Sequence, residues 1–318
     1  MIVRLILFCW LLPFQTTSAD TAAVGANRHA VRFCISGGML RTVNENDARA
    51  SLRAYSKQLA ESRGINADPN PTVFNGTSDL AKLLNAGVAD FATLTTEEFL
   101  AMEESLTGPL LMSVMNGSIF EEYVLLLRGD SGVNTLPELK GRRLSVVDNP
   151  QTSMADCWLE VLLGEQKLGV PETFFSRVTR VAKASQAVLP VFFHQCDACL
   201  VTLKGFNLMG ELNPQLTNQI RVLAVSPQIV PHLTCFRADF DPSTKERIAK
   251  AAKEASNFIG GKQLMTIFQC DRVEEMPSAR LDRARELLAA RARLRSNTGG
   301  AESAPPPPLN PAKEMGNR

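Results

Sequence analysis

The run Asp148–Ser153 places several small polar residues directly after an apolar segment that ends at Val147. A helix is expected to begin at Thr152, and the first backbone N–H groups of a helix lack intrahelical partners. These donors and the helix dipole favour an anion. Thr152 and Ser153 are therefore candidate anion ligands, with Gln151 and Asn149 beside them. From these residues alone an ordinary N-cap is the favoured interpretation, because Ser and Thr are common helix caps.

Three further polar loops follow predicted strands. Ligands of α/β proteins bind in the crevice at the carboxyl ends of the strands, so these loops are candidates for the opposite wall of a site. As plain turns and caps they need no ligand. The candidate residues are Ser36 and Gly37 after the first strand, Thr77 and Ser78 before a helix, and Thr95 after the third strand.

A C-x-x-C motif, Cys196 to Cys199, follows His194. Such a pair can be redox-active or half of a zinc site. Here it leads into a strand and no fourth ligand is near, which favours structural thiols or a disulfide. An exported chain permits disulfides, and the pairs considered are Cys157 with Cys196 and Cys235 with Cys270.

Composition excludes several function classes. The chain has 318 residues, 45% hydrophobic and 21% charged, with a formal net charge of +1. That is an ordinary globular balance, and it gives no reason to expect nucleic acid as a partner. No serine-hydrolase, Walker or zinc-protease motif occurs, and only three histidines are present. We therefore expect no enzyme activity, no cofactor and no catalytic metal.

The two ends of the sequence differ from its middle. Residues 1–19 have the short basic start, apolar run and small residue of a secretory signal, so we expect a periplasmic protein. Residues 296–318 are rich in Gly, Ser and Pro, and we expect a disordered tail. Between them, strands alternate with helices, which predicts an α/β fold. Two apolar strands stand out, Tyr123–Arg128 and Arg221–Ser226.

The order of these segments resembles a known family. The strand from Glu121, the run Leu136–Leu144, the loop Asp148–Ser153 and the segment Arg221–Pro227 are similar to the periplasmic solute-binding proteins of the phosphate, phosphite and phosphonate type. This resemblance implies a type II two-lobed clamshell in which each lobe is a mixed sheet flanked by helices. Lobe 1 would comprise residues 30–122 and 227–290, and lobe 2 residues 129–220. Residues 123–128 and 221–226 would form the hinge strands.

The resemblance also implies a function. The chain would be a monomer that captures a small phosphate- or phosphonate-like oxyanion in the cleft and delivers it to an ABC permease. Thr152 and Ser153 match the family's oxyanion-holding positions; Tyr123 would lie at the hinge, and Asp197 is a candidate for an aminoalkyl group. The family's aromatic-rich loop after the first strand is replaced by Ser36–Met39. A sensory adaptor for a membrane signalling partner is the alternative, and a thiol-dependent redox or metal protein is a third reading.

Overall fold

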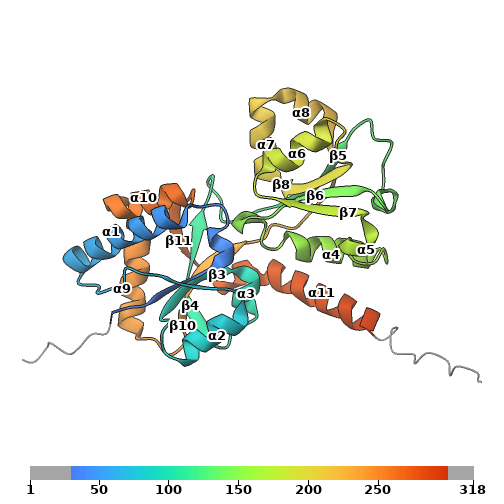
Figure 1. Ribbon diagram of the computed structural model, residues 1–318. Coiled ribbons are helices and arrows are strands. Elements are labelled where there is room, and N and C mark those ends of the chain that lie inside the picture. The colour runs from blue at the N-terminus through green and yellow to red at the C-terminus, as the bar shows by residue number, and fades with distance from the viewer. Residues whose placement is uncertain (1–29, 300–318) are drawn as a thin grey trace, which may run out of the picture.

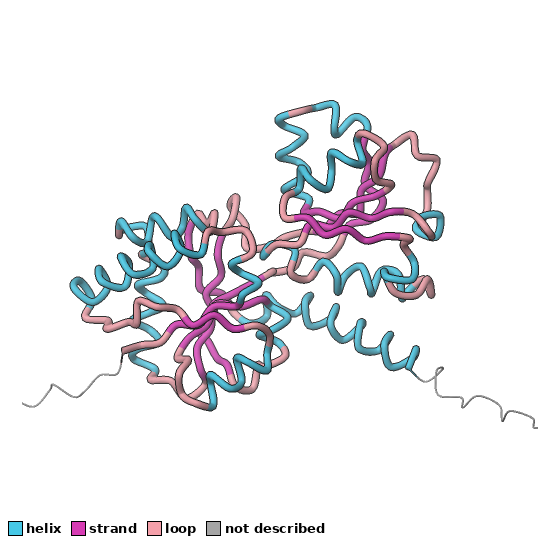
Figure 2. The backbone as a smooth tube through the Cα atoms, in the orientation of Figure 1, coloured by secondary structure: helices cyan, strands magenta, loops and turns pink. Residues whose placement is uncertain are grey.

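The computed structural model describes residues 30–299 and shows two α/β lobes, each built around its own sheet (Figures 1 and 2). The proposed signal peptide and residues 300–318 of the proposed tail lie outside these residues. Within residues 30–299, no helix is both long and apolar enough to cross a membrane.

The first lobe contains a sheet of six strands in the order β11-β4-β10-β3-β1-β2. β1 is parallel to β2 and β3, whereas β10 and β11 run antiparallel to their neighbours. The strands are β1 (Phe33–Ser36), β2 (Thr72–Phe74), β3 (Phe91–Thr95), β4 (Leu106–Val114), β10 (His232–Arg237) and β11 (Arg272–Met276). The helices are α1 (Glu45–Arg63), α2 (Thr77–Asn85), α3 (Thr96–Leu100), α9 (Pro242–Lys253) and α10 (Ile259–Ile267).

The second lobe contains a sheet of five strands in the order β7-β6-β8-β5-β9. β6 is parallel to β7 and β8, and β5 is antiparallel to β8 and β9. The strands are β5 (Tyr123–Arg128), β6 (Arg143–Val147), β7 (Arg177–Val181), β8 (Ala198–Thr202) and β9 (Ile220–Val225). The helices are α4 (Ala155–Glu165), α5 (Pro171–Phe174), α6 (Ala184–Phe192), α7 (Leu203–Leu212) and α8 (Pro214–Gln219).

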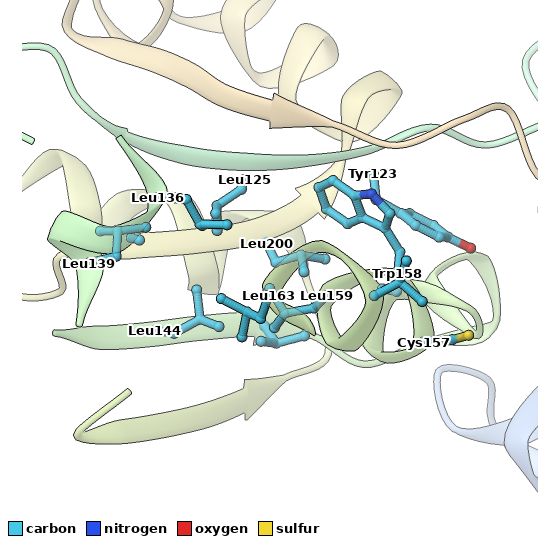
Figure 3. Close-up of a cluster of buried hydrophobic side chains, with 14 of the residues drawn as sticks. Tyr123, Leu125, Leu136, Leu139, Leu144, Cys157, Trp158, Leu159, Leu163 and Leu200 are labelled. Atoms are coloured by element: carbon cyan, nitrogen blue, oxygen red, sulfur yellow. The ribbon is translucent and has the colours of Figure 1, made fainter. Parts of the chain in front are cut away.

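Each sheet buries both faces. In the second lobe, Tyr123, Leu125 and Leu127 of β5 belong to the core on the α4 side, where Trp158 packs on Tyr123 (Figure 3). Val124 and Leu126 face the α6 and α7 side. This double burial explains why β5 is apolar at every position but its last rather than alternating.

The chain crosses between the lobes twice, along residues 115–122 and 226–231. Glu121 and Ile229 exchange backbone hydrogen bonds of 2.8 and 2.9 Å, so the crossings run side by side. Ser226 Oγ accepts from the Tyr123 amide at 2.7 Å where they enter the second lobe. The predicted hinge strands are thus β5 and most of β9, both inside the second sheet, and the crossings adjoin them.

The last helix, α11 (Asp282–Gly299), lies beneath α4 of the second lobe (Figure 1). Ala284 and Leu287 enter the core of that lobe. Arg285 in its first turn and Arg291 near its middle pair with Glu103 and Glu97 of the first lobe. The expected tail beginning at Ser296 is corrected here, because residues 296–299 continue this helix.

Candidate functional site

Two adjoining cavities lie at the junction of the lobes. The first, here called the cleft, has a volume of about 850 Å³ and is lined by both lobes. The second, here called the chamber, has a volume of about 820 Å³ and extends into the first lobe between the sheet and helices α1 and α10. Both volumes lie within the ~300–1,000 Å³ range of small-molecule sites. The residues that line both cavities include Met115, Asn149, Gln151, Ala184 and Met265.

An ion pair between half-buried Lys204 and buried Glu121 lies in the wall of the cleft. Lys204 Nζ donates to Glu121 Oε1 at 3.1 Å, to the Phe120 carbonyl at 2.6 Å and to the Met115 carbonyl at 3.3 Å. Glu121 is 5% exposed, and its Oε2 meets no partner within residues 30–299. Burial raises the pKa of Glu121, and Lys204 opposes that rise. The pair joins the second lobe to the first crossing segment.

The start of α7 also faces the cleft. Thr202 caps this helix, and its Oγ1 accepts from the Gly205 amide at 3.1 Å. Thr202, Lys204 and Gly205 all line the cleft. The helix dipole therefore places partial positive charge at the cavity wall.

Two lysines without carboxylate partners border the cavities from opposite sides. Lys183 lies at the start of α6 in the second lobe and lines the chamber, next to Ala184, which lines both cavities. Lys262 lies in α10 of the first lobe and lines the cleft. Both side chains are exposed, and neither makes an ion pair with any residue from 30 to 299. The lobes thus each bring one available cation to the site.

The predicted anion loop is positioned by its own side chains. Asn149 Oδ1 accepts from the amides of Gln151 and Thr152 at 3.0 and 3.2 Å. Thr152 is 6% exposed and donates to the Val147 carbonyl at 2.7 Å, and Ser153 donates to the Pro231 carbonyl at 2.6 Å. Asn149 and Gln151 line both cavities, whereas Thr152 and Ser153 line neither. The two hydroxyls therefore shape the loop and fasten it to the second crossing segment.

The same loop contacts the first lobe elsewhere. Arg41 forms an ion pair with Asp148. Gln151 Nε2 lies 3.7 Å from Met115 Sδ. His232 at the start of β10 bonds the Pro150 carbonyl; burial lowers the pKa of this histidine to about 4, so its imidazole is neutral near pH 7. These contacts hold the loop across the mouth of the chamber.

The remaining predicted site residues line neither cavity. Ser36 is 2% exposed and donates to Glu98 Oε1 at 3.0 Å. Thr95 forms a capping box with the same Glu98. Gly37 packs so closely on Asn75 that a Cβ added to Gly37 would lie 2.3 Å from the Asn75 Oδ1 atom. Thr77 and Ser78 form the first turn of α2.

Tyr123 and Asp197 are likewise structural. Tyr123 is fully buried against Trp158, and its hydroxyl accepts from the Met154 amide at 3.4 Å (Figure 3). Asp197 accepts from the Arg143 amide and side chain at 2.8 and 3.0 Å. Neither is placed to contact a ligand in the cleft.

The two proposed disulfides are wrong, because all six cysteines within residues 30–299 are free thiols. Cys157 belongs to the core on the α4 face of the second sheet, whereas Cys196 packs on the opposite face. Cys235 points into the α2 side of the first lobe, while Cys270 lines the chamber on the other side. In each pair the sheet stands between the two sulfur atoms.

The C-x-x-C motif shows no metal site in the described chain. No group of three His, Cys, Asp or Glu side chains from residues 30–299 converges around it or elsewhere. Cys199 is fully buried and Cys196 half-buried, and burial raises the pKa of both thiols.

Sequence analysis missed Glu121, Lys183, Lys204, Lys262 and His232 as site residues. Lys204 and Lys183 each stand at the start of a helix that follows a strand, which is the signal that singled out Thr152. Lys262 and His232 carry no local signal, because only the tertiary fold brings α10 and the start of β10 to the junction.

Solved structures show the same fold at low sequence identity. XAC2383 from Xanthomonas citri bound to ATP has a TM-score of 0.62 at 16% identity, covering 84% of this chain and 99% of that one. PhnD1 from Prochlorococcus marinus in complex with methylphosphonate has a TM-score of 0.53 at 13% identity, covering 81% and 96%. PA3383 from Pseudomonas aeruginosa, a binding protein component of an ABC phosphonate transporter, has a TM-score of 0.51 at 13% identity, covering 86% and 99%.

These similarities confirm the type II periplasmic-binding-protein fold. Comparison with curated protein sequences gives no match. A family model does match: it describes the periplasmic substrate-binding protein of phosphonate ABC transporters and aligns with residues 38–279. The chain therefore belongs to this family of periplasmic substrate-binding proteins.

Proposed function

We propose that this protein captures an oxyanion of the phosphate or phosphonate type in the cleft and delivers it to an ABC permease. The observation that carries the proposal is the pair of uncompensated cations, Lys183 and Lys262, one on each lobe beside the cavities. Without a ligand, closure of the lobes would bring the two positive charges closer together, which is unfavourable. Closing them around an anion would neutralise both, so ligand binding and closure favour each other.

The surrounding groups support this choice. The positive end of α7 faces the cleft, and Gln151 offers an amide that can donate to a ligand oxygen. The two acidic residues of the cleft already have partners: Glu121 is paired with Lys204, and Asp271 accepts from the Gly117 amide at 2.9 Å. Thr152 and Ser153 act indirectly in this proposal, by holding Gln151 in place.

Thermal shift and calorimetry with methylphosphonate, phosphate, phosphite, sulfate and an alkylsulfonate test the proposal. A ligand at 100 times its Kd stabilises the folded protein by about 2.7 kcal/mol. Each of Lys183→Ala and Lys262→Ala should weaken binding by roughly 10- to 150-fold, the loss expected for one charged hydrogen bond. Lys140→Ala and Lys250→Ala are matched controls, because both lysines are exposed and lie outside both cavities. If no oxyanion binds, or the Lys183/Lys262 double variant binds as wild type does, the proposal is wrong.

A further inference from the structure

The chamber is too large and too apolar to serve only as the end of a site for a small oxyanion. One wall is the sheet face with Ile35, Phe91 and Leu111, and the opposite wall is formed by Leu52 of α1 and Leu264 of α10. Protein interiors normally leave few voids larger than a water molecule. A cavity of roughly 150 Å³ already holds a benzene ring, and the chamber, at about 820 Å³, is more than five times larger.

The helices that cover the chamber, α1, α9 and α10, are also fastened to each other. Gly260 lets α10 approach α1 so closely that a Cβ there would lie 2.5 Å from the Tyr55 nitrogen. Gln58 Oε1 accepts from the Gly260 amide at 3.0 Å, and the Tyr55 hydroxyl donates to the Ala251 carbonyl at 2.7 Å. These contacts hold the covering helices against one another, and this packing keeps the chamber open.

The chamber joins the cleft at a boundary that contains both apolar and polar side chains. Met115 and Met265 line both cavities, and methionine adapts readily to different apolar shapes. The rest of the shared boundary is formed by Asn149, Gln151, Ala184, Gln269 and Cys270. A single molecule can therefore extend from the polar cleft into the apolar chamber.

One polar group in the chamber points to a ligand. His232 is 4% exposed and lines the chamber next to the Pro150 loop, and its Nδ1 meets no partner within residues 30–299. Its bond to the Pro150 carbonyl assigns the proton of the neutral ring to the other nitrogen, which leaves Nδ1 as an acceptor. A buried acceptor without a donor is unfavourable, and a ligand hydroxyl or amide near the boundary would supply that donor.

We propose that the physiological ligand is an anionic amphiphile: its oxyanion head occupies the cleft and its hydrocarbon chain fills the chamber. This inference rests on the proposed function, because it takes the anion site in the cleft as given and adds the chemical class of what is attached to the anion.

A series of n-alkylphosphonates tests it on the wild-type protein. Calorimetry with methyl-, butyl-, hexyl-, octyl- and decylphosphonate, each below its micelle concentration, should show affinity rising by up to about fourfold per added methylene, the value for full burial of a CH₂ group. The rise should level off once the chamber is filled. Decanol, which has the chain without the head, should bind far more weakly than decylphosphonate.

Variants that fill the chamber provide the second test. Leu52→Trp from the helix side and Val73→Phe from the sheet side should each reduce decylphosphonate affinity more than tenfold while leaving methylphosphonate affinity unchanged. Leu212→Trp is the matched control, since Leu212 is 82% exposed and lies outside both cavities.

The outcomes separate the two proposals. Tight binding of methylphosphonate with no gain from longer chains would overturn the amphiphile inference and leave the proposed function standing. Failure of every phosphonate to bind would overturn this inference, and the proposed function falls with it if phosphate, phosphite, sulfate and the alkylsulfonate fail as well. Equal affinity for decanol and decylphosphonate would show that the head is not recognised and would also overturn the inference.

Discussion

The Lys204–Glu121 pair gives the sharpest prediction about stability. In Lys204→Met, the Glu121 carboxylate keeps its buried position but loses its counter-ion, and two carbonyls lose a donor. Removing one partner of a buried ion pair costs about 3–5 kcal/mol. The Lys204 side chain is 29% exposed against 6% for Glu121, so water reaches the site from one side. We therefore expect a loss of ~2–3 kcal/mol at pH 8.

This loss should depend on pH in a defined direction. Burial raises the pKa of Glu121 above its usual 4.5, and removing Lys204 removes the charge that opposes the rise. A carboxyl whose folded-state pKa is raised stabilises the fold at pH values below its unfolded pKa and loses that contribution as pH rises. The deficit of Lys204→Met should therefore shrink when the pH falls from 8 to 5.

Urea denaturation at the two pH values measures this effect. Trp158 is the only tryptophan beyond residue 19 and packs on Tyr123 in the second lobe, so its fluorescence reports unfolding there. Adding Glu121→Gln to Lys204→Met should recover at least ~1 kcal/mol, since contacting residues couple by this order. Lys253→Met, which breaks an exposed pair with Glu275, is the control and should cost less than ~1 kcal/mol. A Lys204→Met midpoint equal to that control at pH 8, or a deficit that grows on acidification, would refute the reasoning.

Three further predictions concern the junction and the helices that cover the chamber. Wild-type stability should fall by up to ~3 kcal/mol between pH 6.5 and pH 4, because the folded state lowers the pKa of His232 to about 4 while the unfolded chain keeps 6.5; His232→Gln should abolish this slope in denaturant titrations at several pH values. Arg41→Ala, which breaks the pair with Asp148 between the lobes, should broaden the interlobe distances measured by single-molecule fluorescence transfer, and an unchanged distribution would contradict a latching role. Gly260→Ala, whose Cβ would lie 2.5 Å from the Tyr55 nitrogen, should cost ~1–3 kcal/mol by overpacking, seen as a lower Tm than that of the wild type.

Much of the fold can be predicted because local signals agree with it. Helix α1 carries clear local signals, because Asn44 caps its start and Gly64 ends it in a left-handed conformation. The apolar run at Tyr123 is a strand buried on both faces. β4 and β11 lack such signals: β4 contains Gly108 and Pro109, and three of the five residues of the edge strand β11 are charged.

The candidate site was harder to predict, because its polar residues are assembled from distant segments. Asn149 and Gln151 were identified from a loop that follows a strand, and the structure brings both to the cavities. Ser36 and Thr95 show the same local pattern, but their hydroxyls donate hydrogen bonds to the Glu98 carboxylate. A polar residue after a strand can cap, brace or bind, and only its tertiary neighbours decide which of these it does.

Helix α11 alters how the two halves of this molecule can move. Leu294 packs over Gly164 and Arg295 bonds Glu160 on the second lobe, while Arg285 and Arg291 hold Glu103 and Glu97 on the first. In addition to the two crossing segments, helix α11 therefore links the two lobes through these contacts. A helix that contacts both lobes permits the lobes to rotate about the helix axis but resists their wide separation. This restriction reduces the number of open conformations. Closure of the lobes around a ligand then costs less conformational entropy, which favours binding.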